Sequence, residues 1–217
     1  MIHQKTQQLN HEKAEILGLL CAEGTHYKYI AKYWGWSRDP NKKRFREQLT
    51  EGIHFSNMDQ KLLNRFRYLM DKVYQYSPRI TGSSYSLKVQ LKKKSVVKDL
   101  LNYTDLGSLK WTIPEEIMNA DEKIMAAFIR GLYEDDGTKP MKASKNVYHL
   151  YFNMKNYNSL KLVQKMLERL GIATKFWKNR SESMYKLVIY GNENVIKFKN
   201  IINPTVKRIE IAEETRR

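Results

Sequence analysis

The sequence predicts an α+β fold of two halves, each running helix, two strands, helix, two strands, helix. Three correspondences within the chain predict it, and each occurs twice: a helix ending in an acid flanked by glycines, a helix introduced by an Asn-Met pair, and a strand followed directly by a helix. We expect the first half at 1–106, a linker at 107–119 and the second half at 120–217. Homologous halves imply a pseudo-two-fold axis, with the acid-bearing helices on it and an antiparallel sheet in each half.

The first correspondence is a pair of segments with a glycine five residues before an acid, Gly18 before Glu23 and Gly131 before Asp136. A glycine inside a helix costs about 1 kcal/mol relative to alanine. That cost is explained if the two helices cross at Gly18 and Gly131 with their backbones in close approach. Such a crossing brings Glu23 and Asp136 side by side.

A glycine also follows each acid, and Gly24 and Gly137 are predicted to end the helices in the left-handed conformation that glycine favours. The carbonyl end of a helix carries partial negative charge, which disfavours an acid there by about 0.3 kcal/mol or more. An ordinary amphipathic helix followed by glycine explains one copy. Two copies in register favour a pair of carboxylates placed to hold divalent cations.

The other two correspondences are strands and helices. Residues 85–91 alternate apolar and polar side chains as a half-buried strand does, and they align with residues 185–191. Helices are predicted after these strands at 95–101 and 194–202.

The Asn-Met pairs introduce predicted helices at 59–74 and 156–170, and Gly171 is the expected C-cap of the second. Residues 34–46 are predicted to be a long loop or hairpin tip. Pro114 indicates an extended passage through the linker.

The charge of the chain favours nucleic acid as its partner. The formal net charge is +16 over 217 residues, and the pI is near 9.7. A membrane is the weaker alternative, since no apolar run is long enough to span one. The N-terminus lacks the apolar core of a secretory signal, and a single cysteine excludes an internal disulfide. We therefore expect an intracellular protein, in prokaryotic cytoplasm or an organelle.

The two motifs resemble those of the LAGLIDADG homing endonucleases, in the single-chain form that carries both motifs on one polypeptide. The resemblance covers most of the chain and places Glu23 and Asp136 at the family's metal-binding positions. The first motif departs from the commonest form in having glutamate for aspartate, and Cys21 where an acid is frequent. Glutamate keeps the charge and both oxygens, so it still suits a hard cation.

The resemblance implies two αββαββα halves whose antiparallel sheets form a DNA-binding saddle. It also implies a monomer without an obligatory protein partner, and a long double-stranded DNA target cut with short 3′ extensions. Divergence between the halves predicts that this target is asymmetric.

Divalent ions held by two carboxylates supply what phosphodiester hydrolysis needs. With one acid per helix, the remaining ligands are expected to be waters, phosphates and the backbone carbonyls of Ala22 and Asp135, which suits Mg²⁺, with Mn²⁺ or Ca²⁺ able to occupy the same sites. Glu134 and Asp135 are interpreted as helper or surface acids.

The family usually adds a lysine and an amide near each metal. Lys139, three residues after Asp136, is the best basic candidate, and Lys28 is the weaker counterpart after Glu23. The candidate catalytic set is completed by Asn57 and Asn153, at equivalent positions before the second helix of each half, and Lys155. Generic DNA contact or helix capping explains all of these equally well.

The strands are expected to carry the DNA contacts, because a curved sheet or two-stranded ribbon fits the major groove. A solvated charged surface is the alternative, but such surfaces normally mix both signs. The candidate DNA-binding residues are Lys28, Lys32, Arg38, Lys42, Lys43, Arg44, Arg46, Arg79, Lys88, Lys92, Lys142, Lys145, Lys175, Trp177, Lys178, Arg180 and Lys186.

These features together predict a magnesium-dependent, site-specific DNA endonuclease. An intron-splicing maturase, or a non-catalytic nucleic-acid-binding protein on the same scaffold, remains the alternative. A transcription regulator of this fold needs an added helix-turn-helix domain, and a basic ribosomal protein does not explain the matched motifs. Whether the reading frame sits in an intron, an intein remnant or alone stays open.

Overall fold

The computed structural model describes residues 8–36, 43–83, 86–144, 147–178 and 183–211. The elements of the first half are α1 (His11–Glu23), β1 (Gly24–Trp36), β2 (Lys43–Ser56), α2 (Gln60–Tyr74), β3 (Ile80–Ser83), β4 (Ser86–Leu91) and α3 (Lys94–Leu101). Those of the second half are α5 (Glu122–Asp136), β5 (Met141–Ser144), β6 (Val147–Met154), α6 (Tyr157–Arg169), β7 (Lys175–Lys178), β8 (Tyr185–Tyr190) and α7 (Asn192–Ile202). The predicted order of elements is confirmed in both halves.

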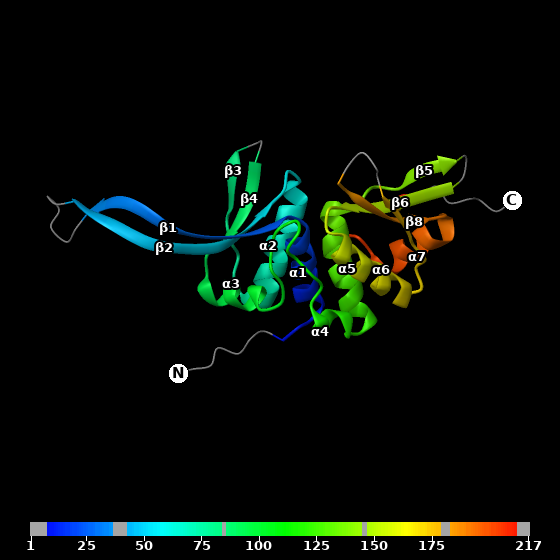
Figure 1. Cartoon of the computed structure of the whole chain (residues 1–217), viewed down its shortest axis with the longest axis horizontal. Helices are drawn as coiled ribbons and strands as arrows, with labels where there is room; N and C mark the ends of the chain where they lie inside the picture. The colour runs from blue at the N-terminus through cyan, green and yellow to red at the C-terminus, as the bar shows by residue number, and fades with distance from the viewer. Residues whose placement is uncertain (1–7, 37–42, 84–85, 145–146, 179–182, 212–217) are drawn as a thin grey trace.

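Each half has one four-stranded antiparallel sheet, with strand orders β1-β2-β4-β3 and β5-β6-β8-β7. The helices lie below both sheets, and α1 and α5 stand together at the centre of the molecule (Figure 1). On the covered side, the ring of Phe55 in β2 stacks on that of Phe66 in α2, with 4.6 Å between the ring centres. The ring of Phe152 in β6 packs edge-on against that of Phe198 in α7, with 6.1 Å between the ring centres. We call this side of each sheet the helix face, and the other side the open face.

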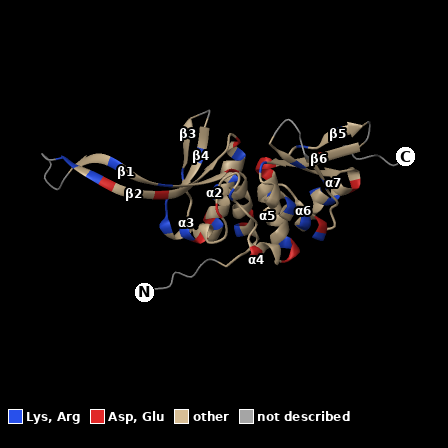
Figure 2. Cartoon of the chain, in the orientation of Figure 1, with Lys and Arg blue, Asp and Glu red and all other residues tan. Residues whose placement is uncertain are grey.

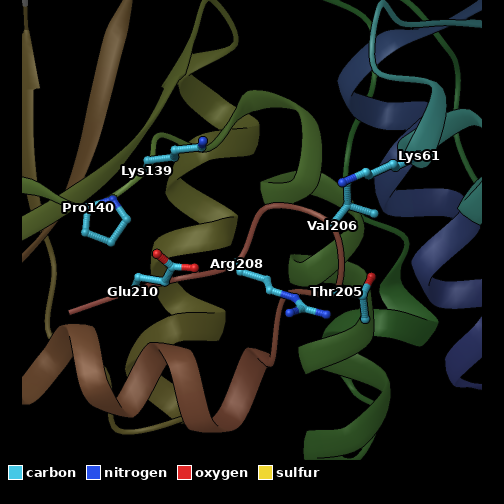
Figure 3. Close-up of a pocket in the computed structure, with 7 residues that line it drawn as sticks. All are labelled: Lys61, Lys139, Pro140, Thr205, Val206, Arg208 and Glu210. Carbon is cyan, nitrogen blue, oxygen red and sulfur yellow. The ribbon is translucent and has the colours of Figure 1, made fainter. Parts of the chain in front are cut away.

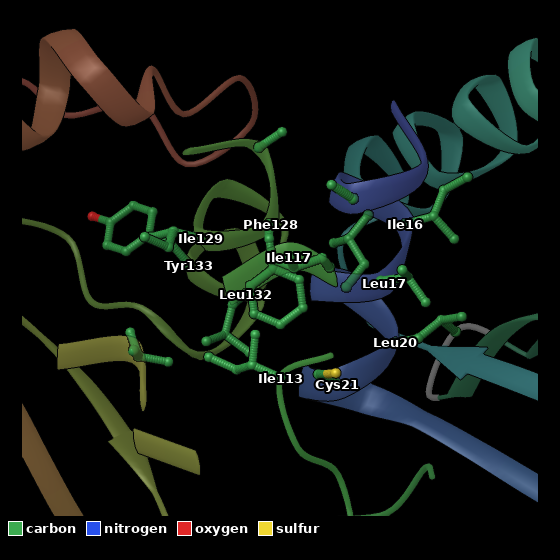
Figure 4. Close-up of a cluster of buried hydrophobic side chains, with 14 of the residues drawn as sticks. Ile16, Leu17, Leu20, Cys21, Ile113, Ile117, Phe128, Ile129, Leu132 and Tyr133 are labelled. Atoms are coloured by element: carbon green, nitrogen blue, oxygen red, sulfur yellow. The ribbon is translucent and has the colours of Figure 1, made fainter. Parts of the chain in front are cut away.

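The two motif helices cross at their inner glycines, as the sequence predicted. A Cβ atom on Gly18 would lie 2.1 Å from the carbonyl oxygen of Phe128, and one on Gly131 would lie 2.2 Å from that of Glu15. No larger side chain fits either position without moving the partner backbone. Around the crossing the two helices bury apolar side chains, among them Leu17, Leu20, Phe128 and Leu132 (Figure 4).

The predicted left-handed conformation of Gly24 and Gly137 is wrong. Both glycines have extended backbone conformations, with φ −76° at Gly24 and −80° at Gly137. They are required by space instead, because a Cβ atom would lie 2.3 Å from the Leu20 carbonyl oxygen at Gly24 and 2.0 Å from the Tyr133 ring at Gly137.

The other predicted helices and strands agree with the structure to within two residues where it describes them. Gly171 lies one residue beyond the C-cap, Leu170, and has the positive φ of 71° that helix ends favour.

In the segment 34–46, predicted as a long loop or hairpin tip, residues 34–36 and 43–46 are strand, because cross-strand pairing continues out to Trp36 and Lys43. Residues 37–42 lie outside the described residues. Only β2 residues from Ile53 onward pair with β4. The rest of β1 and β2 therefore projects from the body as a two-stranded ribbon, which we call the arm (Figure 1).

The connection between the halves packs into the core. It contains a short helix, α4 (Glu115–Met118), and buries Trp111, Ile113 and Ile117. The Trp111 carbonyl accepts hydrogen bonds from Asn156 Nδ2 at 2.8 Å and Ser159 Oγ at 2.6 Å.

Buried ion pairs join the motif helices to their neighbours. The Glu15 carboxylate of α1 accepts from Arg65 of α2 at 2.7 Å and from Arg130 of α5 at 3.1 Å. Lys13, also buried, pairs with Asp99 of α3 at 2.7 Å. Removing one partner of such a pair leaves the other charge buried and unpaired, which is strongly destabilising. These pairs therefore favour the packing of α1 against these particular helices.

Among the residues that the structure describes, no helix has the length and apolar character needed to cross a bilayer.

Candidate metal centre and nucleic-acid interface

The ends of the motif helices bring three carboxylates together. Oxygen atoms of Glu23, Asp135 and Asp136 all lie within 4.8 Å of one another. Glu23 closes α1 and the two aspartates close α5, so the close crossing at the inner glycines places them at the seam between the two sheets. In Figure 2 the acids at the end of α5 stand out there.

Burial first, and like charge second, raises the pKa values in this cluster. Burial, then the carboxylates of Asp135 and Glu23, raise the pKa of Asp136 to about 8. Burial and the Glu23 carboxylate raise the pKa of Asp135 to about 7. Burial also raises the pKa of Glu23. The cluster is thus short of positive charge, and a divalent cation is the occupant that its hard oxygen donors fit.

Asp135 differs from its predicted role as a donor of its backbone carbonyl alone. Its carboxylate belongs to the cluster and accepts a hydrogen bond from Asn57 Nδ2, across the seam between the halves. Its carbonyl accepts from Lys207 Nζ at 2.7 Å. Ala22 stands at the matching position of the first motif, so that motif has no counterpart of the Asp135 carboxylate.

Lys207 is the basic residue beside the cluster that the sequence did not reveal. It lies after α7, and its ammonium donates to the carbonyls of Asp135 and Gly137, 5.7 Å from the centre of the Tyr133 ring. Burial lowers the pKa of Lys207, against the opposing pull of the nearby acids. No motif marks Lys207, because it reaches the site only through the return of the chain after α7.

Glu134 is not a surface acid. It is 3% exposed, and its carboxylate accepts from the backbone N–H groups of Thr205, Val206 and Lys207, the last at 2.6 Å. Glu134 therefore holds the segment that delivers Lys207. Cys21 takes this position in the first motif and is buried with a raised thiol pKa.

The predicted amide pair is not equivalent in the structure. Gly24 pairs with Phe55 and Gly137 with Phe152, so Asn57 lies two residues beyond its phenylalanine and Asn153 only one. Asn57 reaches the cluster, whereas the side-chain oxygen of Asn153 is buried and has no hydrogen-bond partner among the described residues.

The predicted lysines of the catalytic set do not enter the cluster in this structure. Lys139 is exposed and lines a cavity beside it, and Lys155 is exposed. Lys28 lies 3.7 Å from Glu51 on the neighbouring strand.

The strand register shows which of the predicted DNA-contact residues lie on the open face of each sheet and which lie on the opposite face. On the open face lie Arg44, Arg46, Lys88, Lys175, Trp177 and Lys186. Lys92 follows β4, where with Lys88 it helps burial to lower the pKa of His54, an open-face residue. Arg79 is exposed just before β3.

Four predicted contacts lie on the opposite side. Lys28, Lys32, Lys43 and Lys142 are on the strand face that continues the helix face, because they alternate with the open-face positions. Lys32 pairs with Glu47 at 3.1 Å, and Lys43 lies over the Trp36 ring at 4.9 Å. Arg38, Lys42, Lys145 and Arg180 lie outside the described residues, as does the side chain of Lys178.

The open face also carries tyrosines that we did not predict as contacts. Tyr27, Tyr29 and Tyr33 alternate along β1, and the Tyr27 hydroxyl accepts from Gln90 Nε2 at 2.8 Å. In the second half, Lys186 Nζ lies 4.9 Å from the centre of the Tyr151 ring. Their alternation at 27, 29 and 33 was the available signal, since side chains at even spacing share a strand face.

The halves of the chain match family models. Residues 123–203 match the LAGLIDADG-like domain, and residues 47–111 match the WhiA LAGLIDADG-like domain.

Curated relatives are much longer proteins. The chain is 28% identical over 199 residues to a DNA polymerase of Thermococcus aggregans, and the aligned region covers 88% of this chain and 10% of that protein. It is 22% identical over 176 residues to the ribonucleoside-diphosphate reductase NrdEB subunit alpha of Bacillus subtilis, covering 78% of this chain and 15% of that subunit. The chain thus spans a small part of these relatives.

Solved structures share the fold. I-DmoI in complex with DNA and Mn matches with a TM-score of 0.63 and 18% identity, over 91% of this chain and 99% of that one. The N-terminal LAGLIDADG domain of DUF199/WhiA matches with a TM-score of 0.54 and 18% identity, over 94% of this chain and 86% of that one. With a LAGLIDADG-like match in each half and the fold of the homing endonuclease I-DmoI, the chain is a two-motif LAGLIDADG protein.

Proposed function

We propose that the chain is a site-specific endonuclease that hydrolyses one phosphodiester in each strand of a long, asymmetric DNA target. The observation that carries the proposal is the cluster of Glu23, Asp135 and Asp136 at the seam between two open sheet faces. I-DmoI, which shares the fold, has been solved with DNA in the presence of Mn and of Mg. We propose that the present chain acts as a monomer with Mg²⁺ and leaves short 3′ extensions.

Glu23 and Asp136 are the proposed metal ligands, one from each motif, with the Ala22 carbonyl as a further donor. We add the Asp135 carboxylate, because one of its oxygens lies within 4.8 Å of an oxygen of each of these two acids. Divalent ions bound there would relieve the charge of the scissile phosphate and lower the pKa of an attacking water.

The remaining groups orient this centre. Asn57 fixes the Asp135 carboxylate across the seam. The Lys207 ammonium bonds the carbonyls of Asp135 and Gly137, and so holds the end of α5. Because an ammonium next to the cluster also offsets part of its negative charge, Lys207 favours the approach of a phosphate.

DNA is proposed to lie over both open faces. Arginine and lysine side chains there suit guanine edges and phosphates. The proposed contacts are Arg44, Arg46, Arg79, Lys88, Lys92, Lys175, Trp177 and Lys186, joined by Tyr27, Tyr29, Tyr33 and Tyr151. We propose the halves at 1–106 and 120–217 as the units that each cover one half of the target.

The match to the WhiA domain model favours a second candidate, a LAGLIDADG scaffold that binds nucleic acid without cutting it. A maturase belongs to the same class. These candidates predict retention of a specific nucleic acid without cleavage.

Cleavage of a large randomised DNA duplex library with Mg²⁺ tests the proposal. The Glu23→Gln/Asp136→Asn double variant runs in parallel. We expect the wild type to enrich one long cut site and the variant to enrich none while still binding the selected sequence. If the wild type retains one sequence without cutting it, the binding scaffold replaces the nuclease.

A further inference from the structure

A cavity of about 580 Å³ opens beside the acid cluster, between the two halves. Lys61 of α2 lines it from the first half, and Lys139, Pro140 and the segment after α7 line it from the second (Figure 3). Thr205, Val206, Arg208 and Glu210 are the residues that this segment contributes. The cavity is therefore formed by residues of both halves together.

The lining of the cavity has more positive than negative side chains. Lys61, Lys139 and Arg208 face it against one carboxylate, Glu210. Within the described part of the chain, none of these three cations has a carboxylate within ion-pair distance. Three cations against one carboxylate leave the lining with a net positive charge, which favours an anionic occupant.

The walls of the cavity are positioned by the same contacts that build the acid cluster. Glu134 holds the N–H groups of residues 205–207, so Arg208 follows a fixed segment rather than a free terminus. Lys207, which bonds the Asp135 carbonyl, lies between Val206 and Arg208. Lys139 is three residues beyond Asp136, and Lys61 four beyond Asn57. The cavity is therefore next to the proposed site of hydrolysis.

We infer that the cavity holds a phosphate of the DNA backbone adjacent to the one hydrolysed at the second motif. This inference rests on the proposed function. Lysine ammonium and arginine guanidinium groups bind phosphate oxygens with charge-assisted hydrogen bonds, and Thr205 adds a hydroxyl. The contact sets the register of one DNA strand and carries no base preference.

The contact belongs to one motif only. In the first motif Cys21 stands where the second has Glu134, and a thiol does not hold three backbone N–H groups as the carboxylate does. The residue matching Lys139 is His26, which pairs with Glu51 at 3.0 Å. The inferred phosphate contact is therefore made to one strand of a bound duplex and has no equivalent on the other strand.

The salt dependence of binding to a random-sequence DNA duplex, measured with Ca²⁺, tests the inference. Each lost phosphate contact lowers the slope of log K against log salt by about 0.9. We expect the Lys61→Ala/Arg208→Ala variant to lose about that much. The matched control is Lys165→Ala/Lys199→Ala, which removes two exposed lysines from the outer helices α6 and α7 and keeps the wild-type slope. Circular dichroism and thermal unfolding confirm that both variants fold.

An unchanged slope in the cavity variant overturns the inference while leaving the proposed nuclease untouched. A wild type that binds no duplex overturns both. Calorimetric titration with inorganic phosphate separates the two sources of the anion. Saturable phosphate binding that the cavity variant loses, together with an unchanged DNA slope, would assign the cavity to a free anion instead.

Discussion

Gly18 and Gly131 occupy the same crossing from opposite sides: a Cβ atom on the first would lie 2.1 Å from the Phe128 carbonyl oxygen, and one on the second 2.2 Å from that of Glu15. Each glycine thus lets the backbone of the other helix approach. The distance between the two motif acids depends on this approach, because Glu23 and Asp136 each lie five residues further along their helices.

Substitution of either inner glycine tests this packing. Gly18→Ala is expected to lower the free energy of unfolding by about 3 kcal/mol, since the methyl group meets backbone atoms that cannot rotate away. Urea denaturation measures it. The control Asn158→Ala, on the exposed side of α6, is expected to change the free energy by less than about 0.5 kcal/mol. Equal stability of Gly18→Ala and wild type would contradict the crossing.

Removal of either motif acid is expected to abolish cleavage and to spare binding. Glu23→Gln or Asp136→Asn should lower the rate of double-strand cleavage at least about 100-fold, the scale of losing one charge-stabilising group. Gel-shift and cleavage assays on a selected target measure the two effects separately. Glu122→Gln, an exposed acid in the first turn of α5, is the control. A similar loss in the control would refute the assignment of ligands.

Lys207→Met is expected to lower the single-turnover cleavage rate by about 10-fold or more, with a smaller change in DNA affinity. The physical reason is that the end of α5 loses the ammonium that holds the carbonyls of Asp135 and Gly137. Lys207→Arg keeps the charge and is expected to recover part of the rate. The control is Lys199→Met, which changes an exposed lysine of α7. Indistinguishable cleavage rates for the two methionine variants would contradict the proposed role of Lys207 in positioning the end of α5.

The acid cluster predicts a stability that falls as pH rises. Burial and like charge raise the pKa of Asp136 from 3.8 to about 8, with Asp135, Glu23 and Lys207 as its charged neighbours. Between these values the folded protein holds protons that the unfolded chain releases, so the free energy of unfolding decreases with pH. Thermal unfolding without metal should show this decrease, and Asp136→Asn should flatten it.

Divalent ions give the matching control for this pH dependence. Mg²⁺ binds the ionised carboxylates of the folded state, so it should raise the melting temperature more at high pH than at low pH. A melting temperature that neither pH nor Mg²⁺ changes would contradict the acid cluster.

The arm offers a test of which face meets DNA. Arg44→Ala/Arg46→Ala removes two open-face cations and is expected to weaken binding to duplex DNA and to lower its salt slope by up to about 2. Lys28→Ala/Lys32→Ala removes the same charge from the other face, where both lysines lie near glutamates. We expect this second variant to change DNA binding little. A larger loss of binding from Lys28→Ala/Lys32→Ala than from Arg44→Ala/Arg46→Ala would show that DNA binds the face opposite to the one we propose.

The sequence by itself determined the two-fold repeat, the motif helices and their crossing. Glycine–acid spacing and the alternation of apolar residues are local signals, and the repetition of each supported the other. Glu23 and Asp136 were identified by the same spacing, and the structure places them together.

Only the tertiary structure decided the surroundings of those acids. Lys207 and Glu134 meet because the chain returns to α5 after α7. Asn57 reaches Asp135 because the packing of α1 against α5 brings the two halves together. The assignment of Lys28 and Arg46 to opposite faces needed the strand register, since a shift of one residue exchanges the two faces of a strand. These contacts join residues far apart in the chain, so no spacing within the sequence records them.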